Sequence, residues 1–105
     1  MKVLFDQGTP VPLRNHLEGH EIDTAFELGW SSLRNGELLE AGEQGAYQVL
    51  ISTDQSIRYQ QNLSGRTMAI VVLLSTSWPN IQKRVRDIQA VVDMAAPGTY
   101  TEVTI

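Results

Sequence analysis

Two short apolar runs, each followed by the dipeptide Asp-Gln, constrain the fold of this chain most strongly. Residues 3–5 lead directly into Asp6, and residues 49–51 lead through a Ser-Thr pair into Asp54. Apolar runs of this length, bounded by polar and turn-forming residues, are typical of buried strands. If the two strands are parallel neighbours, Asp6 and Asp54 meet at one edge of the sheet, where open α/β sheets bind ligands.

The rest of the chain alternates strand patterns with helix patterns. We expect strands near residues 3–6, 20–25, 48–52, 68–74 and 99–105, and helices near residues 10–18, 35–44, 57–63 and 77–95. Asn35 is the expected cap of the second helix and Gly45 its expected stop. This alternation predicts an α/β fold, a three-layer α/β/α sandwich with a mostly parallel sheet of about five strands, in one domain over residues 1–105. Right-handed crossovers place the first and third strands side by side.

Composition limits the classes of protein to consider. The 105 residues are 42% hydrophobic and 19% charged, as in an ordinary globular domain. The absence of cysteine excludes disulfides and zinc-thiolate sites, and His16 and His20 are poorly placed for a histidine-rich metal site. No apolar run approaches the roughly 20 residues of a membrane span, and the first residues lead into a strand rather than a signal peptide, so we expect a cytoplasmic protein.

Charge is unevenly distributed along the chain. The net charge is -4, yet residues 55–86 contain five basic residues and no acid, namely Arg58, Arg66, Lys83, Arg84 and Arg86. One interpretation is a strip that contacts phosphates, and the other is the solvated face of a helix.

Acids at one sheet edge predict a cation site. Two carboxylates about 4 Å apart repel by roughly 4 kcal/mol at an effective dielectric constant of about 20, which a bound cation or a shared proton relieves. Glu37 is a third candidate, because the helix that it opens begins at the same edge as Asp6. Oxygen ligands of this kind suit Mg²⁺ or Mn²⁺. The alternative is structural: Asp6 and Asp54 cap loops, and Glu37 complements the helix dipole.

Several motifs, in order and spacing over most of residues 2–74, resemble the short PIN-like (PilT N-terminus-like) proteins. They occupy residues 3–7 with Pro10, then residues 19–22, 27–30, 35–39 and 52–55. That group is described as predicted nucleases of toxin–antitoxin type. The resemblance implies a Mg²⁺- or Mn²⁺-dependent endoribonuclease, with Asp6, Glu37 and Asp54 as catalytic residues and metal ligands. It also implies RNA as substrate and an antitoxin protein as partner.

Candidate RNA contacts follow from this interpretation. Arginines neutralise phosphates and tryptophans stack on unpaired bases, so the candidates are Arg58, Arg66, Arg84 and Trp30, with Trp78 at the same rim. For both tryptophans the alternative is packing between loop and helix.

The sequence departs from the family pattern in two places. The family commonly shows Thr-x-Asp-x-Asp-Phe, whereas Ser56 and Ile57 replace the second acid and the aromatic residue here, and the usual Asp-Glu-Asn is reduced to Asp6-Gln7. A second hypothesis is therefore a catalytically inactive PIN-like module that binds nucleic acid or protein. A third hypothesis is a phospho-receiver domain. Such domains need an acidic pair after the first strand and a lysine after the fifth, and this chain has neither.

The last strand pattern bears on assembly. An exposed edge strand is a template for pairing with another chain, so we expect residues 99–105 to favour a homodimer.

Overall fold

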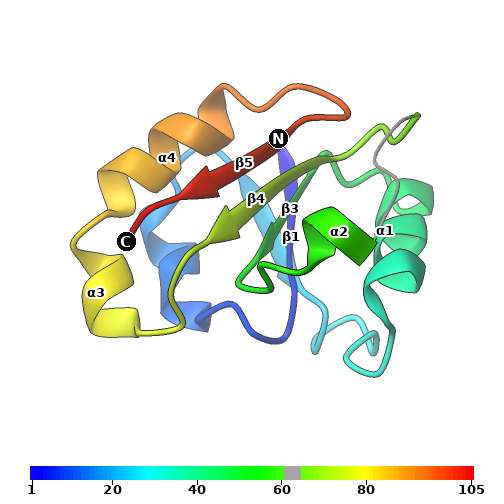
Figure 1. The fold of residues 1–105 in the computed structure, drawn as a ribbon, viewed down its shortest axis with the longest axis horizontal. Helices are drawn as coiled ribbons and strands as arrows, with labels where there is room; N and C mark the ends of the chain where they lie inside the picture. Colours follow the sequence, from blue (N-terminus) through cyan, green and yellow to red (C-terminus); the bar gives the residue numbers. More distant parts are fainter. Residues whose placement is uncertain (61–64) are drawn as a thin grey trace.

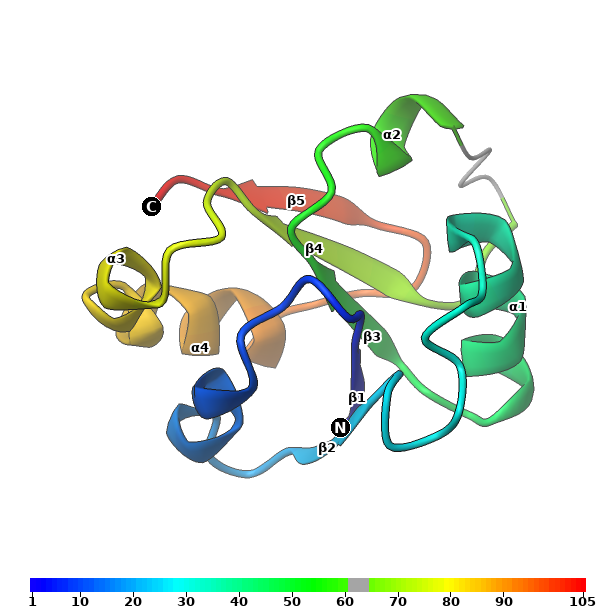
Figure 2. The same cartoon turned by 90° about the horizontal axis from the view of Figure 1, so that it is seen from below.

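A computed structural model describes residues 1–60 and 65–105, so the end of the helix expected near residues 57–63 lies outside the described part. Five parallel strands form one sheet in the order β2-β1-β3-β4-β5, and helices cover both of its faces (Figures 1 and 2). The predicted three-layer α/β class is confirmed. Along the chain the elements are β1 (Lys2–Phe5), the 3-10 helix η1 (Val11–His16), β2 (Glu21–Thr24), α1 (Asn35–Gln44), β3 (Val49–Ser52), α2 (Ile57–Gln60), β4 (Ala69–Leu73), α3 (Trp78–Gln82), α4 (Val85–Asp93) and β5 (Tyr100–Val103).

The expected neighbours β1 and β3 pair directly. Leu4 lies opposite Leu50, and Phe5 lies opposite Ile51. The connection through η1 leads to β2 on one side of β1, whereas the connection through α1 leads to β3 on the other side. The carboxyl ends of β1 and β3 therefore lie together, at the point where the strand order reverses direction.

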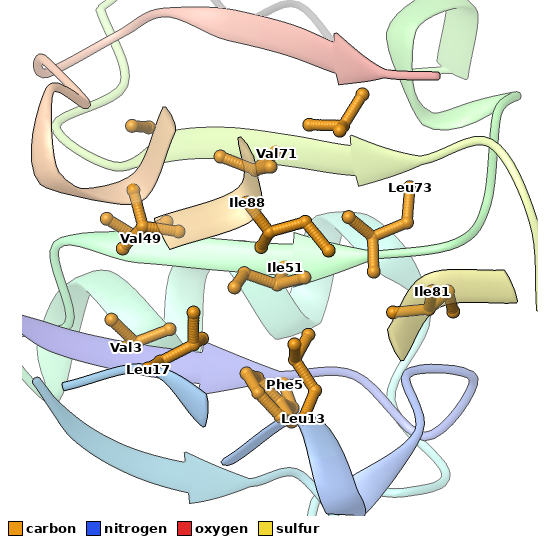
Figure 3. Close-up of a cluster of buried hydrophobic side chains, with 13 residues drawn as sticks. Val3, Phe5, Leu13, Leu17, Val49, Ile51, Val71, Leu73, Ile81 and Ile88 are labelled. Carbon is orange, nitrogen blue, oxygen red and sulfur yellow. The ribbon is translucent and has the colours of Figure 1, made fainter. Parts of the chain in front are cut away.

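Alternating side chains of the strands build two cores. On one face, residues such as Phe5, Ile51 and Val71 pack against Leu13 of η1 and Ile88 of α4 (Figure 3). The opposite face carries a second cluster beneath α1 and α2, which includes Leu4, Leu50, Ile70, Leu38 and Ile57. Because the central strands are buried on both faces, their sequences are continuous apolar runs instead of alternating ones.

Two of the expected helices differ from the prediction. The first is a 3-10 helix, in which the hydrogen bonds span three residues, as from Leu13 N to Pro10 O at 3.2 Å. The helix expected over residues 77–95 is divided into α3 and α4, since Arg84 has a ψ of 15° and its N–H bonds to the carbonyl of Ile81 at 2.8 Å. Within the described ranges, none of the helices combines the length and apolarity that crossing a bilayer requires.

The cap at the start of α1 differs from the prediction, whereas the helix ends as expected, after Gln44 and with Gly45 as its C-cap. Arg34 is the N-cap residue instead of Asn35, and its N–H donates to Glu37 Oε1 at 3.0 Å. At the other end Gly45 has an ordinary φ of -81°, and the next residue, Ala46, has the left-handed φ of 63°. The N–H of Tyr47 then donates to the carbonyl of Gly42 at 2.9 Å, which closes the helix end.

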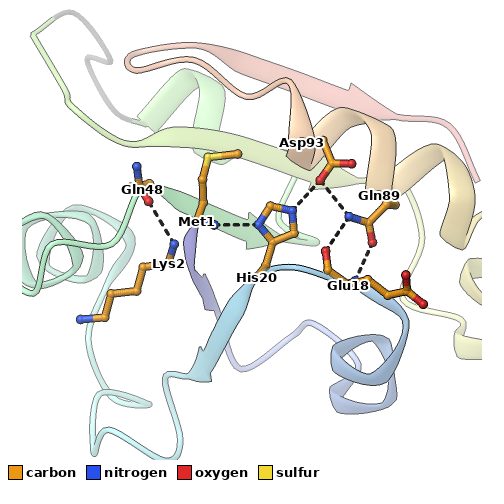
Figure 4. Close-up of polar contacts among 7 residues, drawn as sticks. All are labelled: Met1, Lys2, Glu18, His20, Gln48, Gln89 and Asp93. Carbon is orange, nitrogen blue, oxygen red and sulfur yellow. Dashed lines mark hydrogen bonds and ion pairs between the residues drawn. The ribbon is translucent and has the colours of Figure 1, made fainter.

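A polar network ties the amino ends of β1 and β2 to α4 (Figure 4). His20 Nδ1 lies 3.0 Å from the amino group of Met1, and its Nε2 lies 2.6 Å from Asp93 Oδ1. Gln89 donates to the same Asp93 oxygen at 2.8 Å and to the carbonyl of Glu18 at 3.0 Å. This network lies at the amino ends of the strands, whereas Asp6 lies at their carboxyl ends. His20 therefore has a structural role.

Replacing Ala46 with glycine should stabilise the protein. Glycine adopts the left-handed conformation without the Cβ clash, although it also increases the entropy of the unfolded chain, so we expect a gain of up to about 1 kcal/mol in the free energy of unfolding. Urea denaturation followed by circular dichroism measures it. The control Ala46→Ser retains a Cβ and should give no gain; an equal gain would contradict this explanation.

Candidate functional site

Asp6 lies directly after β1 and is almost completely buried, with 8% of its surface exposed. Its Oδ1 accepts hydrogen bonds from Gly8 N at 3.1 Å and from Thr9 Oγ1 at 2.7 Å, and its Oδ2 accepts one from Ser52 Oγ. Burial raises the pKa of Asp6 above its usual 3.8, although the hydrogen bonds from Ser52 and Thr9 act in the opposite direction. The environment of Asp6 thus disfavours its charged form.

Ser52 connects Asp6 to Asp54. It is the last residue of β3, is fully buried, and has a hydroxyl that donates to Asp6 while accepting from Asp54 N at 3.0 Å. The following residue, Thr53, donates through Oγ1 to the carbonyl of Gly8 at 3.3 Å. The loops after β1 and β3 are therefore in direct contact, as the sequence predicts.

Asp54 has an environment unlike that of Asp6. Its Oδ1 accepts hydrogen bonds from Ser56 N at 2.9 Å and Ser56 Oγ at 2.6 Å, and its Oδ2 accepts one from Asn35 Nδ2 at 2.8 Å. The Ser56 hydroxyl is the main reason that the pKa of Asp54 lies below its usual 3.8, followed by Asn35. Ser56, at the position of an expected acid, therefore acts as a hydrogen-bond donor that keeps Asp54 ionised.

Glu37 does not share the hydrogen bonds of Asp6 and Asp54. It is exposed, and its Oε1 accepts the hydrogen bond from Arg34 N. In residues 1–60 and 65–105, no three or more histidine, cysteine, aspartate or glutamate side chains are grouped so that they could hold a metal ion. The structure therefore joins Asp6 to Asp54 and brings the start of α1 to Asp54 through Asn35. Ligation of one ion by all three acids stays a prediction.

A cavity of about 460 Å³ opens beside Asp6. Its walls come from the segments after β1 and β2, and they include Arg14, Phe26 and Glu27. Arg14 and Glu27 form an ion pair across it, and the hydrogen bond from Arg14 is the main reason that the pKa of Glu27 is lowered. Phe26 is 78% exposed. Sequence reasoning missed this aromatic residue, although its position just past an expected strand is a usable signal.

The expected RNA contacts on the basic segment separate in space. The guanidinium of Arg58, on α2, lies 5.8 Å from the ring centre of Tyr59 and 5.7 Å from that of Tyr100. Tyr59 is 83% exposed, five residues after Asp54. Arg66 instead precedes β4, at the amino ends of the strands, and forms an ion pair with Glu43 at 2.5 Å. Of these two arginines, Arg58 therefore lies on the helix that begins three residues after Asp54, whereas Arg66 lies just before the next strand.

The remaining candidates already have partners within the chain. Arg84 lies 3.5 Å from Asp87 in a half-exposed pair. Trp30 packs edge-on against Tyr47, with ring centres 6.1 Å apart, and joins the second core. Trp78 packs against the first core. For the tryptophans these contacts match the packing alternative.

Replacing Gly8 with alanine tests the contact between the two loops. A Cβ at this position would lie 2.7 Å from Thr53 Oγ1, so Gly8→Ala should cost about 1–3 kcal/mol in the free energy of unfolding. The cost should shrink when Thr53 is also changed to alanine, because the clashing oxygen is then absent. Urea unfolding of the four proteins gives the coupling energy, and an equal cost in both backgrounds would refute the contact.

The lowered pKa of Asp54 predicts a pH-dependent stability. A carboxyl group whose pKa is lower in the folded state stabilises the protein above its unfolded pKa, and this contribution is lost as the pH falls through the folded value. Asp54→Asn should therefore be less stable than the unaltered protein at pH 7, by about 1–3 kcal/mol. The difference should shrink below pH 3.8.

Urea unfolding between pH 3 and pH 7 measures this difference. Ser56→Ala removes the main cause of the shift, so stability in this variant should depend less on the ionisation of Asp54. A difference between Asp54→Asn and the unaltered protein that stays constant across the range would contradict the assignment.

Comparisons with protein-family models, curated proteins and solved structures found no match. The α/β class follows from the parallel sheet and its helices. The PIN-like resemblance rests on the sequence motifs.

Proposed function

We propose that this protein binds RNA at the carboxyl ends of β1 and β3 and cleaves it in a reaction that depends on Mg²⁺ or Mn²⁺. One observation carries the proposal: the Ser52 hydroxyl joins Asp6 and Asp54 at the point where the strand order reverses. Open parallel sheets bind ligands at that point. The PIN-like motifs are the reason for choosing RNA as the substrate and an antitoxin as a further partner.

The chemistry of the side chains fits a hard cation in part. Mg²⁺ is commonly held by one or two carboxylates, with water and substrate phosphates completing its shell. The network supplies only oxygen ligands of this kind, from Asp6, Asp54 and the hydroxyls around them. Among the described residues no third carboxylate lies with them. The side chains therefore fit an ion that is held by two carboxylates. When bound, such an ion would neutralise charge on the phosphate and lower the pKa of a bound water.

The protein's own residues would position the RNA. Asp54 is kept ionised by Ser56 and Asn35, and these donors also fix the orientation of its carboxylate. Arg58 follows on α2 and is suited to a phosphate, while exposed Tyr59 offers a ring on which a base can stack. A single-stranded segment that passes over α2 would thereby reach Asp54.

A second candidate function is a non-catalytic binding module. It is favoured by the hydrogen bonds that both oxygens of Asp6 and both oxygens of Asp54 accept from the chain itself. Carboxylates held in this way stabilise loops without any ion. Exposed Phe26, beside the cavity at Asp6, would then be part of the binding surface.

Incubation of labelled single-stranded RNA with Mn²⁺ tests the proposal. We expect cleavage that stops when the ion is chelated and that falls by roughly 10- to 100-fold or more in Asp54→Asn. The matched control Glu40→Gln removes one negative charge from an exposed position of α1 and should leave cleavage unchanged.

The other outcomes are also decisive. RNA binding without cleavage would favour the non-catalytic module. Cleavage of equal rate in Asp54→Asn would remove this site from the reaction. Absence of both binding and cleavage would overturn RNA as the ligand.

A further inference from the structure

Strand β5 forms an open edge of the sheet. Among the residues that the structure describes, it pairs with β4 alone, and the carbonyls of Thr99 and Val103 accept hydrogen bonds from the N–H groups of Ile70 and Leu74. Because main-chain groups alternate in direction along a strand, the N–H and C=O groups of Tyr100 and Glu102 point away from the sheet. The four residues of β5 include neither proline nor lysine, which commonly protect such edges.

An apolar groove lies beside this edge. It has a volume of about 320 Å³ and is formed by the end of α4 and by β5, with Val91, Met94, Ala95 and Thr101 among its walls. Met94 is 84% exposed. An open strand edge and an exposed methionine thus lie on one continuous surface, which we call the β5 surface.

We propose that the β5 surface binds a second copy of this chain across a two-fold axis. The two β5 strands would run antiparallel, with Thr101 of one copy opposite Thr101 of the other, so that two five-stranded sheets become one. This inference is independent of the proposed cleavage of RNA.

Self-complementarity argues for this occupant and this register. Tyr100 of each copy then lies opposite Glu102 of the other, where main-chain groups that point outward meet and exchange hydrogen bonds. Tyr100 already donates to its own Glu102 at 3.0 Å, so the phenol and the carboxylate are suited to each other. A shift that placed Glu102 opposite itself would bring like charges together.

The same register joins the two grooves. Thr101 lies on the face of β5 that α4 covers, so the grooves would merge across the axis and the two Met94 side chains would meet. Burial of this exposed apolar surface favours association.

Light scattering coupled to size exclusion tests the association at protein concentrations from about 1 to about 100 µM, where a micromolar dissociation constant is visible. We expect twice the monomer mass. Met94→Lys should shift the protein to monomer, because association would bury two ammonium groups. Glu102→Pro should do the same by removing an outward N–H, which an edge strand tolerates without loss of its fold. The control Phe26→Lys changes another exposed apolar residue and should remain dimeric.

A cysteine scan tests the register, since the chain has no native cysteine. Thr101→Cys should form a covalent dimer with oxidised glutathione, because opposed residues have Cα atoms within disulfide range. Glu102→Cys should form much less, since the two cysteines would be offset along the strands. A monomer throughout the concentration series, unchanged mass in Met94→Lys with native circular dichroism, or preferential crosslinking of Glu102→Cys would overturn the proposal.

Discussion

The complete burial of β3 is the constraint on which the rest of the structure depends. Its four residues are inaccessible to solvent, and three of them are apolar, while the fourth is Ser52. A buried hydroxyl requires partners, because leaving one unpaired costs roughly 1–3 kcal/mol. Ser52 finds them in the carboxylate of Asp6 and the N–H of Asp54. Filling the core thus brings together the two acids at the carboxyl ends of the central strands.

The two acids then acquire opposite properties. Asp6 is desolvated between β1 and β3, so its pKa rises, whereas Asp54 accepts hydrogen bonds from Ser56 and Asn35, so its pKa falls. Pairs of carboxyl groups whose environments separate their pKa values are typical of sites that bind charged groups or move protons. The same hydrogen bonds hold the loops in place, and this dual role is why both an RNA site and a non-catalytic module are consistent with the contacts.

The amino ends and the carboxyl ends of the strands carry different kinds of polar contact. At the amino ends, contacts such as His20 with Asp93, Arg66 with Glu43 and the Lys2 ammonium with the carbonyl of Gly45 hold strands to helices. At the carboxyl ends, the polar groups converge around Asp6 and Asp54, and two exposed aromatic residues, Phe26 and Tyr59, lie on the segments that follow β2 and β3. Ligand sites in open α/β sheets occupy the carboxyl ends, so this asymmetry agrees with the proposed location of binding.

The sequence by itself determined the strands, the α/β class and the adjacency of β1 and β3, because apolar runs and right-handed crossovers depend on local pattern and chain handedness. Tertiary structure alone decided the partners of the polar groups. Ser52 donates to Asp6, Asn35 donates to Asp54, and Arg66 is paired with Glu43, and in each case at least 19 residues of sequence separate the two partners. Hydrogen bonds and ion pairs depend on distances of a few ångströms between distant segments, and no local pattern encodes such distances.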